Sequence, residues 1–169
     1  LHNAGGEIST SIAPLVSVET KLDEAAKLMG KMAQDAFYMV DNQMFNNYIK
    51  SAIIAHQKWL ATLQKMATEK VIMPIQIDDT KCGFGHFYYA IVPQNAKVKE
   101  LWNAIKAKHK TFHQFGTGVI KALYDEKYDQ ANEIYQEAEV YSEGLIKQLN
   151  DIIAITNSLS NSGERVFEN

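Results

Sequence analysis

Apolar residues recur every three or four positions over most of this chain, which is the spacing of one face of an α-helix. The pattern predicts a first helix over 16–68, a short helix over 81–92, a third over 96–124 and, after a turn at 125–129, a fourth to about 160. Asn46 and Asn47 could interrupt the first helix, since Asn is unfavourable inside helices. The expected fold class is all-α: an antiparallel four-helix bundle with a long N-terminal helix and one short helix that bears Cys82.

Composition agrees with a helical domain and excludes several functions. Only three prolines and nine glycines interrupt 169 residues. With 17 basic and 20 acidic residues well mixed, the chain lacks the basic stripe that nucleic-acid binding requires. No apolar run approaches the ~20 residues of a membrane span, so no membrane insertion of this fragment is expected. A first residue other than Met suggests a fragment of a longer protein.

The periodic pattern also suggests the organisation of the domain. We expect a flexible lead-in over 1–15, a single four-helix-bundle domain over 16–160, and a polar, frayed tail over 161–169. Between the first two helices the periodicity fails around Pro74, which favours an ordered loop.

Three histidines occupy core-facing steps of the predicted helices. His56 lies on the apolar face of the first helix, whereas His109 and His113 lie one turn apart on the third. A single inward histidine is usually a hydrogen-bonded core residue. Three of them facing one apolar interior are costly unless a ligand binds their lone pairs, and this favours a metal site.

Cys82 is the only cysteine, so no intrachain disulfide can form. Three imidazoles and one thiolate are a donor set that tetrahedral zinc prefers. Iron is less favoured because no carboxylates accompany the histidines, whereas di-iron bundle sites need several. The candidate metal ligands are therefore His56, Cys82, His109 and His113, with Zn²⁺ as the ion. Asp78 and Asp79 could orient a ligand histidine.

Three local motifs carry a family resemblance. They are His-Gln-Lys-Trp at 56–59, Cys-Gly-Phe-Gly-His-Phe at 82–87 and His-Lys-Thr-Phe-His at 109–113, with 26 residues from His56 to Cys82 and 27 from Cys82 to His109. In this order they resemble the bacterial chemoreceptor zinc-binding domain family, found in methyl-accepting chemotaxis proteins and diguanylate cyclases. The resemblance covers about 48–155. His86 and Phe87 depart from it, standing where the family usually has a basic residue and a tryptophan; His86 could be an additional ligand or an exposed ring.

The resemblance implies a regulatory sensor of zinc or of oxidants rather than an enzyme. Two alternatives stay open: a zinc hydrolase that uses only the three histidines and a bound water, and a helical bundle with merely packed histidines. The length expected for the first helix, with apolar Met29, Met32 and Met39 beyond the bundle, predicts a homodimer. The expected partner is a signalling domain of the same parent chain. A cytoplasmic location is expected, with an extracytoplasmic receptor domain as the alternative.

Overall fold

The structure is a computed structural model that describes residues 21–29 and 40–168. The chain divides into two compact units, 1–39 and 40–169. In the first unit, 21–29 are helical. The second unit contains four helices: α2 (Asn42–Glu69), α3 (Gly83–Ala90), α4 (Ala96–Tyr124) and α5 (Tyr128–Ser162). Over the described part of the chain no residue lies in a strand, which confirms the all-α prediction.

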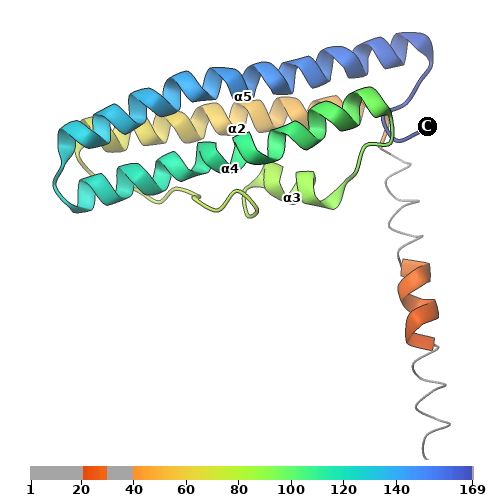
Figure 1. Ribbon diagram of the computed structural model, residues 1–169, viewed down its shortest axis with the longest axis horizontal. Helices are drawn as coiled ribbons and strands as arrows, with labels where there is room; N and C mark the ends of the chain where they lie inside the picture. Colours follow the sequence, from red (N-terminus) through yellow and green to blue (C-terminus); the bar gives the residue numbers. More distant parts are fainter. Residues whose placement is uncertain (1–20, 30–39, 169) are drawn as a thin grey trace, which may run out of the picture. The chain divides into compact units, whose positions relative to one another are not determined.

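The four helices of the second unit form a bundle with alternating directions (Figure 1). α2 and α4 run the same way, α5 returns along both of them, and the short α3 runs opposite to its long neighbours. Fully buried side chains from the three long helices form the core. The largest of these are Phe45, Ile49, Leu63, Met66, Ile105, Phe112, Leu145, Leu149 and Ile152.

α2 is shorter than the continuous first helix predicted over 16–68, and that prediction is wrong. Residues 40 and 41 are not helical, and Asp41 caps α2 by accepting a hydrogen bond from the Met44 N–H at 2.7 Å. The helix then passes without interruption through Asn46 and Asn47. Asn46 is tolerated inside α2 because its amide donates to the Asn157 side chain of α5 at 2.8 Å. The Asn46 side chain therefore marks a contact with α5.

Two other predicted segments agree with the structure. The third helix has the predicted bounds in α4, and the loop between α2 and α3 is ordered against the bundle. It starts at Lys70, whose φ of 57° ends α2 in a left-handed turn. Its position is held by a hydrogen bond from the Trp59 indole to the Gln76 carbonyl at 2.7 Å. Met32 and Met39, part of the stripe that motivated a homodimer, lie outside the described residues.

The tail is the second point of difference, because it is folded back on the bundle and not frayed. α5 extends to Ser162, and Gly163 at φ 75° reverses the chain. Val166 and Phe167 are then buried, with 0% and 5% of their surface exposed. Apolar side chains in a mostly polar tail were enough to pack it against the bundle. No helix in the described ranges has the length and apolar character needed to cross a membrane.

Candidate metal centre

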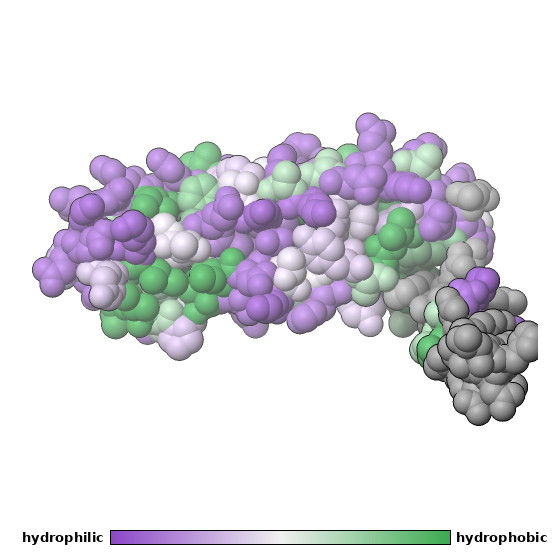
Figure 2. Space-filling model, turned by 60° about the horizontal axis from the view of Figure 1, so that its bottom comes forward, coloured by the Kyte–Doolittle hydropathy of each residue, from purple (hydrophilic) through white to green (hydrophobic). Residues whose placement is uncertain are grey.

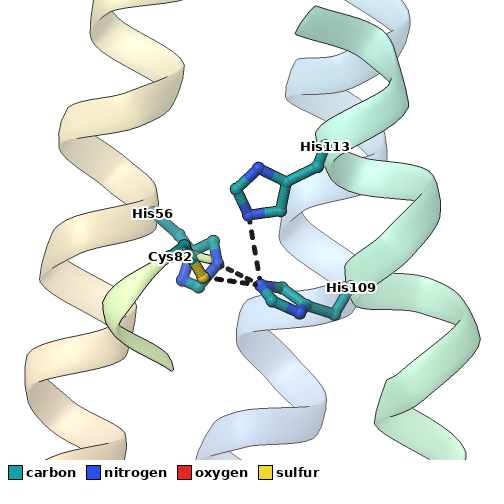
Figure 3. Close-up of side chains that lie close together, drawn as sticks. All are labelled: His56, Cys82, His109 and His113. Atoms are coloured by element: carbon teal, nitrogen blue, oxygen red, sulfur yellow. Dashed lines mark hydrogen bonds between the residues drawn. The ribbon is translucent and has the colours of Figure 1, made fainter. Parts of the chain in front are cut away.

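The fold brings all four predicted ligands to one point (Figure 3). His56 projects from the middle of α2, while His109 and His113 project from neighbouring turns of α4. Cys82 is the N-cap residue of α3, where its sulfur accepts the Gly85 N–H at 3.1 Å. The ligand atoms of the four residues all lie within 4.8 Å of one another. The histidines are buried, and Cys82 is half-buried.

Three of the distances between these atoms are close to the edges of a small tetrahedron. His109 Nε2 lies 2.9 Å from His56 Nε2, 3.2 Å from His113 Nε2 and 3.4 Å from Cys82 Sγ. Tetrahedral zinc with ordinary bond lengths holds two nitrogens about 3.3 Å apart and a nitrogen and sulfur about 3.6 Å apart. Small adjustments of the rings would therefore accommodate one ion at the centre.

Backbone carbonyls determine which ring nitrogens face the centre. His56 Nδ1 lies 2.7 Å from the Ala52 carbonyl, and His113 Nδ1 lies 2.8 Å from the Gln76 carbonyl. A carbonyl oxygen only accepts, so each Nδ1 carries the proton and donates it. In a neutral ring the other nitrogen then presents a bare lone pair. Two such lone pairs meet at His109 Nε2, an arrangement that is repulsive without a proton or a cation between them.

Burial keeps these rings neutral. It lowers the pKa of His56 to about 4 and that of His109 to about 3, and the other histidines add repulsion. It also lowers the pKa of His113, against the opposing effect of its hydrogen bond to Gln76. Burial raises the pKa of the Cys82 thiol, while backbone N–H groups of α3 oppose the shift. A bound cation would instead favour the thiolate form of Cys82, because metal-bound sulfur is deprotonated.

Trp59 and the loop around Gln76 hold His113 in place. The Gln76 carbonyl accepts from both the Trp59 indole and the His113 ring, at 2.7 and 2.8 Å. The two rings pack edge to face with centroids 5.3 Å apart. Gly116, one turn after Phe112 on α4, leaves room for the indole: a Cβ there would lie 2.8 Å from a Trp59 ring carbon.

Sequence reasoning missed the two carbonyls and expected acidic partners in their place. Asp78 instead accepts from Thr80 and pairs with Lys81, and Asp79 accepts from the Tyr89 hydroxyl at 3.2 Å. Both carboxylates act on His113 only through space, by raising its pKa. The prediction that they orient a ligand ring is wrong. A carbonyl carries no side-chain signal, so only the folded structure could show the real acceptors, one in α2 and one in the loop.

His86 is placed away from the centre. Its side chain is exposed on α3 and is not among the four clustered residues. Of the two interpretations open from the sequence, the exposed ring is the one that the structure supports. Phe87, the other departure from the family pattern, stacks on Tyr48 with ring centroids 4.5 Å apart.

Comparison with known proteins gives one match. Among curated proteins and among solved structures, no match to this chain was found. The family model of the chemoreceptor zinc-binding domain matches residues 56–120, a range that contains all four clustered residues. The match agrees with the resemblance seen in the motifs, and residues 56–120 of this chain are similar to the chemoreceptor zinc-binding domain family.

Proposed function

We propose that this chain is a sensory module that binds one zinc ion through His56, Cys82, His109 and His113. The observation that carries the proposal is the convergence of three imidazole nitrogens beside a thiol sulfur. The Ala52 and Gln76 carbonyls leave Nε2 of His56 and of His113 without a proton, and a single N–H at His109 Nε2 would have to serve both of them. Carboxyl groups are absent from the cluster, as expected of a zinc site with nitrogen and sulfur ligands.

Cys82 is the ligand through which the site would respond to an oxidant. Its thiolate can attack a peroxide: an S–O bond forms, the O–O bond breaks, hydroxide leaves, and the sulfur becomes a sulfenic acid while the peroxide is reduced. A sulfenic acid is a poorer ligand, so Cys82 would leave the centre. Because Cys82 also caps α3, its departure would remove the hydrogen bond from the Gly85 N–H to its sulfur and weaken the start of that helix.

A sensor and a zinc hydrolase differ in the fourth ligand. A hydrolase keeps that position for water, whereas here Cys82 Sγ lies 3.4 Å from His109 Nε2 and would occupy it when a metal binds. Metal analysis with anomalous scattering at the zinc edge tests the element and its ligands together. We expect one zinc per chain, much weaker binding in Cys82→Ala, and unchanged binding in His86→Ala. Full zinc binding and hydrolytic activity in Cys82→Ala would overturn the sensory proposal.

Thermal unfolding with and without a chelator addresses the structural alternative. Bound metal contributes directly to the stability of the folded state, so a strong chelator should lower the melting temperature. An equal melting temperature with and without chelator would favour a bundle whose histidines are merely packed.

Exposed apolar side chains support a proposal about the partner of this domain. α2 exposes the apolar side chains of Met44, Tyr48 and Ile54, and Figure 2 shows further apolar patches between hydrophilic areas. Such patches support the homodimer, and light scattering that shows a monomer at micromolar concentration would count against it. We further propose that the parent chain carries the signalling domain and works in the cytoplasm, where a reduced thiolate persists. Fractionation of cells that express the parent protein tests the location.

A further inference from the structure

The C-terminal segment 163–168, which we call the strap, joins two parts of the bundle that are distant in sequence. Val166 makes both connections. Its N–H donates to the Asn42 side chain at 2.9 Å, and its carbonyl accepts from the N–H groups of Gln94 and Asn95 at 2.9 and 3.0 Å. The strap therefore ties the first turn of α2 to the loop between α3 and α4.

Asn42 directs its whole side chain at this end of the chain. Its oxygen accepts from Val166, and its amide nitrogen donates to the Glu164 carbonyl at 2.8 Å and to the Ser160 hydroxyl at 2.9 Å. Asn42 is the first residue of α2, directly after the cap at Asp41. A conformational change that is transmitted along the backbone from the bundle toward residues 1–39 has to pass through this turn.

A row of aromatic rings leads from the strap back to the metal centre. Phe167 packs edge to face on Phe45 at 5.7 Å between centroids, and Phe45 contacts Phe87 of α3 at 6.0 Å. One turn before Phe87, Phe84 packs on the ligand rings of His109 and His56 at 5.0 and 5.9 Å. α3 thus contacts the metal centre through Phe84 and the strap's aromatic support through Phe87, one turn later.

We propose that the strap is a coupling element, which reports the state of the metal centre to the start of α2 through α3. The proposal rests on the proposed function, because Cys82 must be a metal ligand for its release to matter. With Cys82 held in the centre, α3 keeps Phe84 and Phe87 against the core. With Cys82 released, α3 loses its cap, its rings lose their fixed positions, and Phe45 no longer supports Phe167.

Amide hydrogen exchange on the full chain, zinc-loaded and chelator-treated, tests the coupling. The relevant donors are the N–H groups of Gln94, Asn95 and Val166. We expect zinc removal to speed their exchange about tenfold, the size of a typical coupling between sites. The N–H of Asp125, bonded to the Lys121 carbonyl at the opposite end of α4, should exchange at the same rate in both states.

Reciprocity gives a second measurement that does not depend on exchange. If zinc stabilises the strap, then loosening the strap must weaken zinc binding by the same factor. Phe167→Leu should therefore raise the zinc dissociation constant about tenfold in a competition assay with a chelating dye. Tyr124→Leu, at a side chain that is 81% exposed, serves as the matched control and should not change it.

The outcomes separate this inference from the proposed function. Faster exchange in both 82–90 and the strap, with weaker zinc binding in Phe167→Leu, supports the coupling. Faster exchange confined to 82–90, with unchanged binding in Phe167→Leu, overturns the coupling and leaves the zinc sensor standing. A chain that binds no zinc overturns both.

Discussion

Acid should destabilise the zinc-free protein, and its buried histidines, chiefly His56 and His109, determine by how much. Burial lowers the pKa of His56 to about 4 and that of His109 to about 3, well below the 6.5 of an exposed ring. At pH values between these folded-state pKa values and 6.5, His56 and His109 bind protons in the unfolded chain but not in the folded chain. Stability therefore falls as the pH falls through this window and is fully retained above it.

The size of the effect follows from linkage. Each pH unit inside the window contributes about 1.4 kcal/mol per ring, and the loss is smaller close to pH 6.5, where the unfolded rings are only partly protonated. From pH 7 to pH 5 each ring therefore costs about 2 kcal/mol, and His56 and His109 together about 4 kcal/mol. That is a large part of the total stability of an ordinary domain.

Urea unfolding of the chelator-treated protein at pH 7 and pH 5, followed by circular dichroism, measures this difference. Replacement of one titrating ring, as in His56→Gln, should reduce it by about half. His86→Gln, which changes an exposed ring, should leave it unchanged. A loss of less than about 1 kcal/mol in the unmodified chain would refute the reasoning, since it would mean that the buried rings titrate as they do in the unfolded chain.

Glycines near the centre supply further predictions. Gly116→Ala brings a Cβ to 2.8 Å from Trp59, so we expect weaker zinc binding and altered tryptophan fluorescence; an unchanged dissociation constant would show that the indole can move freely. Gly144→Ala is the matched control: nothing lies within 4 Å of its Cβ, and the melting temperature should rise because alanine stabilises a helix by roughly 0.5–1 kcal/mol relative to glycine. Gly85→Ala drives a Cβ into the Asp79 carbonyl, so thermal unfolding should show a loss of several degrees; a melting temperature equal to that of the parent would contradict this close contact.

The sequence by itself determined the parts of this protein that depend on local periodicity. α4 has the predicted bounds because its apolar residues keep a helical period between Asn95, whose side chain caps the helix, and a turn. His109 and His113 face one point because residues four apart share a face of any helix. The core-facing position of His56 on the first helix joined it to that pair, and the donor set and the family motifs added Cys82.

Only the tertiary structure decided the features that depend on contacts between distant residues. Asn42 and Val166, 124 positions apart, bond to each other and turn an expected frayed tail into a packed strap. The break before α2 is of the same kind: the apolar pattern continues through it, but Asp41 caps the helix there. The Gln76 carbonyl determines that a lone pair of His113 faces the centre. Every residue has a carbonyl, so the sequence does not show which one accepts this hydrogen bond. Periodicity placed the rings, and backbone atoms of a folded loop determined which nitrogen of this one faces the centre.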